Sequence, residues 1–219
     1  MITTELLIDT PKSPAPRAWL LLAHGAGAPM TSPFMNTMVS LLTERNIAVT
    51  RFEFAYMAAR RDDGKRRPPP KAELLVPEFE AAVAAVAALP ARAGIPLLIG
   101  GKSMGGRIAT LCADRLFGRR IISGAAVLGF PFHPPGKPDR LRTAHLENLR
   151  CPLLIVQGER DPFGCRDEVD RLTLSPAIHF AWAADGDHDL GPRASSGTTR
   201  KANLATAADA VAAFTEDLS

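Results

Sequence analysis

The chain has 219 residues, 46% of them hydrophobic and 22% charged, and 26 Lys and Arg against 23 Asp and Glu give a net charge of +3. This composition excludes a disordered or fibrous chain, and the small charge excess gives no reason to expect a nucleic-acid partner. No apolar run approaches the roughly 20 residues of a transmembrane helix, and the N-terminus lacks a secretion-signal pattern, so we expect no membrane contact.

Seven short apolar runs predict β-strands. Such runs, almost free of polar residues, are typical of parallel strands buried on both faces. The first run is predicted to be an edge strand. The runs are Thr4–Asp9, Ala18–Gly25, Ile47–Phe54, Ile95–Gly101, Gly124–Phe132, Cys151–Gly158 and Ile178–Ala184.

Four amphipathic stretches between these runs predict helices. The first opens at Pro33, the second at Pro77, the third directly after Ser103, and the last covers residues 204–214. Alternating strands and helices predict an α/β fold, with a doubly wound, mostly parallel sheet flanked by helices. We see no linker and expect one domain over residues 1–219.

A basic segment, Arg60–Lys71, reads "RRDDGKRRPPPK". A run of this kind is usually a solvated surface loop, here with a stiff proline tail. It could also form a positive collar that attracts an anionic substrate or an acidic partner. On the second interpretation, Arg66 and Arg67 favour charged acyl substrates over neutral ones.

The stretch "IGGKSMGGR" allows two interpretations. A phosphate-binding P-loop needs a glycine five residues before Gly101, but Pro96 stands there and has no backbone N–H to offer a phosphate. The alternative is a G-x-S-x-G nucleophile elbow, in which Ser103 follows a buried strand and precedes a helix. The second interpretation fits its context. We therefore take Ser103 as the candidate nucleophile.

Ligands of such folds bind beyond the carboxyl ends of the strands. A serine there needs a histidine base oriented by a carboxylate, and α/β-hydrolases place them in the order Ser, Asp or Glu, His. Asp161 and His188 follow later strands in that order. Asp161 could instead start a turn before Pro162, and Glu159 is a rival acid.

The polar residues predicted at these strand ends lie in six places. They are His24, Tyr56, Ser103, His133, Asp161 and His188. The other two histidines, His145 and His179, are predicted to be structural or surface residues because of their positions.

No metal site is expected. Asp185, Asp187 and Asp189 resemble a calcium loop, but Leu190 stands where that loop needs glycine. The three cysteines show no ligand or disulfide spacing, which indicates a reduced cytoplasmic setting. We also expect no cofactor.

The oxyanion of an acyl-transfer reaction needs preorganised donors. One should be the backbone N–H of Met104, the residue after the nucleophile. The second should come from "HGAGAPM" after the first long strand, with Ala26 favoured and Gly25 next. That stretch could also be a simple glycine-rich turn.

Five motifs together resemble the α/β-hydrolase superfamily. They are "LLLAHGAGAPM", "GGKSMGGR", "GFPFHPPGKPDRLRTAHL", "CPLLIVQGERDPFG" and "DGDHDL", over residues 20–190. The sequence is similar to the small lidless members akin to dienelactone hydrolase, and to the group with the testis-expressed hydrolase-like proteins and the hydrolase-like subunit of the NSL chromatin complex. The resemblance implies Ser103 as nucleophile, His188 as base and Asp161 as the orienting acid.

Larger relatives carry a cap domain after the strand that follows the elbow helix. Only residues 133–150 occupy that place here, so we expect an open, shallow pocket with His24, Tyr56, Phe132 and His133 as substrate contacts. These observations predict a serine hydrolase for small soluble esters or related acyl compounds, some of them anionic. The alternative is a non-catalytic scaffold whose basic segment docks an acidic partner.

Overall fold

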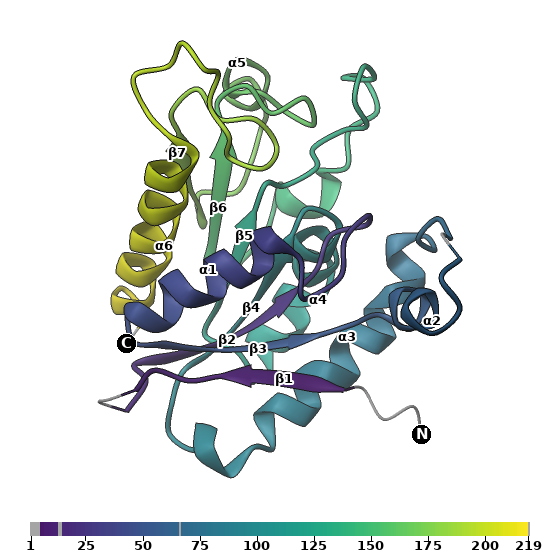
Figure 1. Ribbon diagram of the computed structural model, residues 1–219, viewed down its shortest axis with the longest axis vertical. Coiled ribbons are helices and arrows are strands. Elements are labelled where there is room, and N and C mark those ends of the chain that lie inside the picture. The colour runs from purple at the N-terminus through teal and green to yellow at the C-terminus, as the bar shows by residue number, and fades with distance from the viewer. Residues whose placement is uncertain (1–4, 13–14, 66, 219) are drawn as a thin grey trace.

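The computed structural model describes residues 5–12, 15–65 and 67–218. At its centre is a seven-stranded sheet with the order β1-β3-β2-β4-β5-β6-β7 (Figure 1). Strands β2 to β7 run parallel, and β1 pairs antiparallel with β3 at one edge. This confirms the predicted mostly parallel sheet. The strands are β1 (Leu6–Asp9), β2 (Ala18–Ala23), β3 (Ile47–Phe52), β4 (Leu97–Lys102), β5 (Gly124–Leu128), β6 (Leu153–Gly158) and β7 (Ile178–Ala183).

Helices cover both faces of the sheet. Helices α1 (Pro33–Glu44) and α6 (Arg200–Glu216) lie side by side on one face, over a core that includes Met38 and Val211 (Figure 1). Helices α3 (Ala72–Ala87) and α4 (Met104–Gly118) pack together on the other face. The order of strands reverses between β2 and β4, so the crevice at that switch point is where a ligand is expected.

Strand β5 is shorter than predicted. It stops at Leu128 rather than Phe132. The N–H of Phe130 donates to the side-chain Oε1 of Gln157 (2.7 Å), and its carbonyl accepts from Gln157 Nε2 (3.2 Å). A side chain thus takes the hydrogen bonds that a strand ladder would supply, and the chain turns away from the sheet.

The second predicted helix begins earlier than expected. Helix α3 starts at Ala72, and Pro77 lies inside it. The proline ring removes one hydrogen bond, to the carbonyl of Glu73, which lies in the first turn at the exposed end of the helix. Burial of Ala72 and Leu75 on the same face as Phe79 holds this turn in place.

A further helix, α2 (Ala55–Asp63), was not predicted. It contains the first part of the basic segment, which therefore is not all loop. Arg67 pairs with Asp63 at its end, and Arg61 pairs with Glu53. Arg66 lies outside the described residues. The arginines of this segment that the structure describes are thus partly neutralised by their own neighbours.

The remaining helical elements are short. They are the 3-10 turns η1 (Pro90–Arg92) and η2 (Ala144–Leu146) and the helix α5 (Arg166–Val169). Between β5 and β6, where all residues are described, only η2 occurs, so no cap domain covers the sheet there. Within the described ranges, no helix combines the length and the apolar character needed to cross a membrane.

The turn from β4 into α4 depends on close backbone contact at Gly105. A Cβ atom there would lie 2.5 Å from the carbonyl oxygen of His24 and 2.8 Å from that of Ala23. We expect Gly105→Ala to lower the free energy of unfolding by about 1–3 kcal/mol in urea titrations, because backbone must move to admit the methyl group.

The matched control is Gly118→Ala, in the same helix, where an added Cβ meets no atom within 4 Å. We expect this control to keep or slightly raise the stability, as alanine favours helix. Equal stabilities of the two variants would contradict the close approach at Gly105.

Candidate active site

Ser103 occupies a strained turn between β4 and α4. Its φ of 53° and ψ of −115° lie in a region that non-glycine residues rarely adopt. The backbone N–H of Ser103 donates to the carbonyl of Leu128 at 3.0 Å, which fixes the turn against the end of β5. The hydroxyl consequently stands at the carboxyl edge of the sheet, as the elbow interpretation requires.

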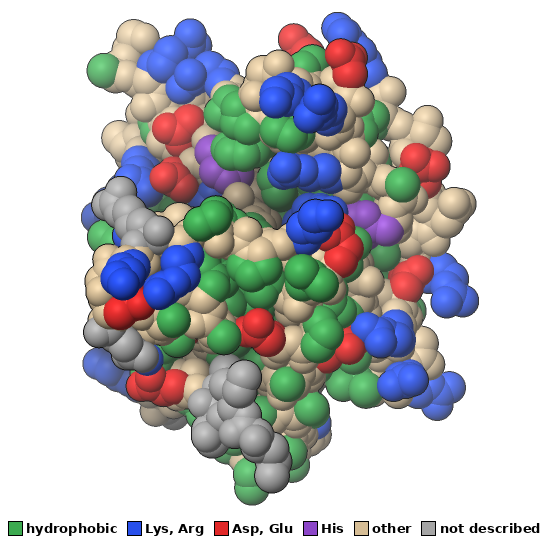
Figure 2. Space-filling model, turned by 90° about the vertical axis from the view of Figure 1, so that its right-hand side faces the viewer, with side chains coloured by type: hydrophobic (Ala, Val, Ile, Leu, Met, Phe, Trp, Pro, Cys, Tyr) green, Lys and Arg blue, Asp and Glu red, His purple; other side chains and the backbone are tan. Residues whose placement is uncertain are grey.

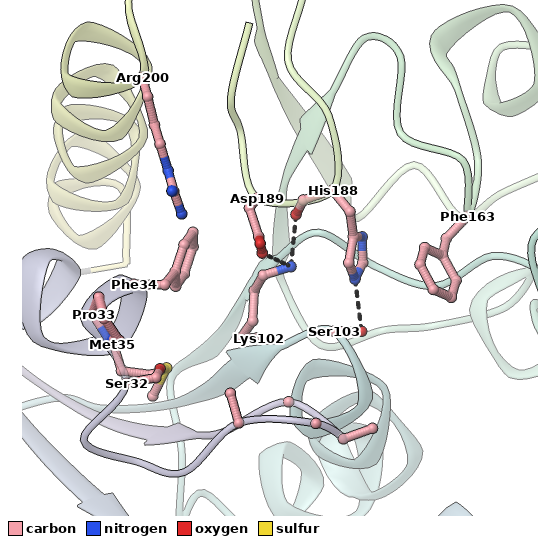
Figure 3. A pocket seen from close by; sticks show the side chains of 14 residues that line it. Ser32, Pro33, Phe34, Met35, Lys102, Ser103, Phe163, His188, Asp189 and Arg200 are labelled. Atoms are coloured by element: carbon pink, nitrogen blue, oxygen red, sulfur yellow. Dashed lines mark hydrogen bonds and ion pairs between the residues drawn. The ribbon is translucent and has the colours of Figure 1, made fainter.

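His188 and Asp161 meet Ser103 at this edge. Nε2 of His188 lies 2.8 Å from Oγ of Ser103 (Figure 3). Its Nδ1 lies 2.8 Å from Oδ2 of Asp161. Asp161 follows β6 and His188 follows β7, so adjacent parallel strands deliver both side chains. The structure thus joins the three candidate residues in one chain of hydrogen bonds. Its two outermost members in sequence, Ser103 and His188, are 85 residues apart.

The Asp161 carboxylate is fully buried and held from several sides. Its Oδ1 accepts from the backbone N–H of Phe163 at 2.8 Å, and its Oδ2 accepts from Nε2 of Gln157 at 2.9 Å. The Phe163 ring also packs on the imidazole of His188, with ring centroids 4.2 Å apart. These contacts satisfy a buried charge, which would otherwise be costly to hold in the core.

The rival acid Glu159 is occupied elsewhere. Its carboxylate pairs with Arg166 and accepts the backbone N–H of Asp185. Asp185 in turn pairs with Arg160 and Arg193, which lowers the pKa of its carboxyl to about 2, chiefly through the Arg193 hydrogen bond.

Asp187 binds backbone rather than a cation. Its Oδ1 accepts the N–H groups of Asp189 and Gly191 within its own turn. No group of three or more potential metal ligands occurs among the residues that the structure describes.

Lys102 is a site residue that the sequence reasoning passed over once the P-loop was rejected. Its ammonium donates to the backbone carbonyl of His188 (2.6 Å) and lies 3.3 Å from the carboxylate of Asp189 (Figure 3). The side chain is 8% exposed, and burial lowers the pKa of Lys102. It therefore ties the loop that carries His188 directly to the end of β4, next to Ser103.

The residues predicted to bind the oxyanion belong to the segments around Ser103. Met104 is the first residue of α4, whose first-turn N–H groups lack intrahelical partners. Ala26, like Ser103, lines the two cavities at this edge of the sheet.

The loop that carries Ala26 is held by two side chains of α2. The hydroxyl of Tyr56 donates to the carbonyl of Ala26 (3.1 Å), and Arg60 donates to that of Gly27 (3.2 Å). Tyr56 thus holds the loop that carries Ala26, and it lines neither of the two cavities, so its predicted contact with substrate stays a prediction.

His24 lies in the core rather than in the pocket. It is fully buried, its Nδ1 pairs with the carbonyl of Gly25 (2.7 Å), and its Nε2 accepts the N–H of Phe54 (3.2 Å). Burial lowers the pKa of His24 to about 4. A neutral ring whose two nitrogens both bind backbone has a structural role. His24 therefore supports the turn at Gly25, and it is not free to contact a substrate as predicted.

Phe132 and His133 line neither of the cavities that include Ser103. Phe132 is fully buried and packs against Phe130 and Phe180. His133 is 3% exposed, and its Nε2 lies 3.2 Å from the carboxylate of Glu168. The segment folds back onto the core because its aromatic rings have apolar partners there. The prediction that it forms an open rim of the pocket did not take these partners into account.

Two cavities adjoin Ser103. The first has a volume of about 450 Å³ and includes Phe34, Lys102 and His188 in its lining (Figure 3). The second has a volume of about 440 Å³ and includes Met104 and Arg107. Gly25 lines the first only. A molecule placed at Ser103 can therefore extend to both sides of the hydroxyl.

Residues 16–216 match the alpha/beta hydrolase domain family. A search of curated proteins gives no significant match.

Solved structures share the fold at low sequence identity. Dienelactone hydrolase from Anabaena variabilis aligns with a TM-score of 0.74 and 17% identity, covering 98% of this chain and 91% of that one. Est1E from Butyrivibrio proteoclasticus, solved with ferulic acid, gives 0.67 and 16%, covering 98% and 94%. A serine hydrolase without lid from Xanthomonas campestris gives 0.60 and 18%, covering 85% and 81%.

The neutral state of buried His24 predicts a pH dependence of stability. Its pKa rises from about 4 in the folded chain to 6.5 on unfolding, so its contribution is complete above pH 6.5 and is lost as pH falls toward 4. Over that window we expect wild type to lose about 2–3 kcal/mol more unfolding free energy than His24→Asn, measured by urea titration at each pH. Parallel losses in both proteins would contradict this assignment.

Proposed function

The chain belongs to the alpha/beta hydrolase domain family, and on that premise we propose that it is a serine hydrolase of carboxylic esters or related acyl compounds. The observation that carries the proposal is the line of hydrogen bonds from Ser103 through His188 to Asp161. A serine hydroxyl is a weak nucleophile by itself, and such a line supplies the base that activates it.

In the first half of the reaction, Ser103 Oγ attacks the carbonyl carbon of the substrate. Its proton passes to Nε2 of His188, and the carbonyl oxygen gains the negative charge. The backbone N–H groups of Met104 and Ala26 would stabilise this oxyanion. When the carbon–oxygen bond of the ester breaks, His188 returns the proton to the departing alcohol, and the acyl group remains on Ser103.

In the second half, water takes the place of the alcohol. His188 accepts a proton from water as its oxygen attacks the acyl carbon, and then gives the proton back to Ser103 as the acid leaves. Asp161 accepts a hydrogen bond from Nδ1–H of His188 and so holds the ring with Nε2 free to accept. No step needs a metal or a cofactor.

The lack of a cap and the size of the two cavities favour small substrates. The cavities, at about 450 and 440 Å³, each have room for one side of a small ester, and both are open to solvent. The alternative of an acidic docking partner receives no support from the basic segment, because Arg61 and Arg67 bind acidic residues of the chain itself.

We expect Ser103→Ala to lower kcat for para-nitrophenyl acetate by about three orders of magnitude or more, because the attacking oxygen is lost. The measurement is the release of para-nitrophenolate by purified protein. The matched control is Ser40→Ala, on the exposed face of α1, which should keep wild-type activity. Activity of Ser103→Ala equal to that of the control would contradict the assigned nucleophile.

We expect Asp161→Asn to lower kcat by about four orders of magnitude while the fold is kept. The amide can present N–H to Nδ1 of His188, which would select the wrong ring tautomer. The assay is the same, with circular dichroism as the check on folding. A folded Asp161→Asn variant with wild-type kcat would refute the orienting role.

A further inference from the structure

The second cavity beside Ser103 is lined by an excess of positive charge. Lys71, Arg107 and Arg142 contribute cations to its wall, and Glu73 contributes the one carboxylate among its lining residues. We call this cavity the basic cleft. Figure 2 shows Lys and Arg side chains gathered around a hollow on the side of the molecule that carries α2 and α3. The charge therefore lies within the site itself.

Two guanidinium groups of the basic cleft are incompletely paired. Arg107 donates one N–H to Glu73 at 2.7 Å, but its buried Nε has no hydrogen-bond partner among the described residues. Arg142 is half-buried, and its side chain makes no hydrogen bond or ion pair with any residue that the structure describes. A half-buried guanidinium without a protein partner, such as that of Arg142, can bind an anion that enters the cleft, and Arg107 adds positive charge beside it.

The like charges also oppose one another. Burial lowers the pKa of Arg142, and the positive charge of Arg107 lowers it further. The Glu73 carboxylate, which pairs with Arg107 and raises the pKa of Arg142, offsets only part of this repulsion. Since the guanidinium fork matches the geometry of a carboxylate, two such groups beside one reactive serine form a receptor for a planar anion.

The position of His188 tells which half of an ester enters the basic cleft. His188 must give its proton to the departing alcohol, so the alcohol lies where His188 is exposed. His188 lines the first cavity, whereas the lining of the basic cleft has Met104, at the oxyanion side, and no His188. The acyl chain therefore points along α4, toward Arg107 and Arg142.

We propose that the basic cleft binds a carboxylate at the far end of the acyl chain, so that the chain prefers monoesters of short dicarboxylic acids. The acid must be short because Ser103 and both arginines line one cavity of about 440 Å³. This proposal rests on the serine hydrolase function above. In this proposal the preference for charged acyl substrates comes from Arg107 and Arg142, and not from Arg66 and Arg67 as the sequence suggested.

The test compares two esters that differ in one charge. Ethyl hydrogen succinate carries a free carboxylate, and ethyl methyl succinate has it blocked; ethanol release is measured for both, because a poor leaving group keeps the carboxylate from cleaving its own ester. We expect wild type to show a higher kcat/KM for the charged ester, and Arg142→Gln to lower the charged-to-neutral ratio by about tenfold or more, which is typical of a lost charge-assisted hydrogen bond. Added salt should lower the wild-type ratio as well.

Two further variants serve as a control and as a substitute for Arg142→Gln. Arg140→Gln, an exposed arginine two residues away that is not part of the cleft lining, should leave the ratio unchanged. If Arg142→Gln does not fold, Lys71→Gln serves in its place, since Lys71 is exposed and lies in the cleft wall. An unchanged ratio in the folded cleft variant, or an equal fall in Arg140→Gln, would overturn the proposal.

A binding measurement separates this proposal from the hydrolase function. Calorimetry of Ser103→Ala with succinate should show binding that weakens by about tenfold or more when Arg142→Gln is added. If wild type cleaves neither ester but succinate binds in this manner, the hydrolase function fails and the anion site stands. Active protein with no succinate binding and no ester preference would refute the anion site alone.

Discussion

The site depends on one constraint, the close passage of α4 across the ends of β2 and β4. The chain reverses at Ser103 with a positive φ, and Gly105 lies against the carbonyls of Ala23 and His24. No larger residue could hold the turn so tightly, and the strain places the hydroxyl at the sheet edge. The packing of the fold thereby sets the position of the Ser103 hydroxyl.

A second constraint is the supply of hydrogen bonds to buried groups around that oxygen. Gln157 links the turn after β5 to the Asp161 carboxylate, and Lys102 links β4 to the loop of His188. Each bond joins segments distant in sequence. Because these groups are buried, breaking one bond leaves a polar atom unsatisfied, so the segments are held in register more firmly than loops usually are.

Much of this could be predicted from the sequence, and the failures have physical causes. The apolar runs predict the strands well because parallel strands are buried on both faces, and Ser103 is marked by its flanking glycines. Helix α2 was missed because its charged residues show no apolar period. Burial of Leu75 extends α3 past Pro77 toward its N-terminus. Arg142 could not be found, since only folding brings it beside Arg107.

The central claim is that Ser103 becomes a nucleophile through His188. Its most direct test is to treat the protein with a fluorophosphonate, digest it, and locate the added mass by peptide mass spectrometry. The account predicts one adduct, on Ser103, which disappears when His188 is replaced by alanine. An adduct on another residue, or none at all in folded protein, would contradict it.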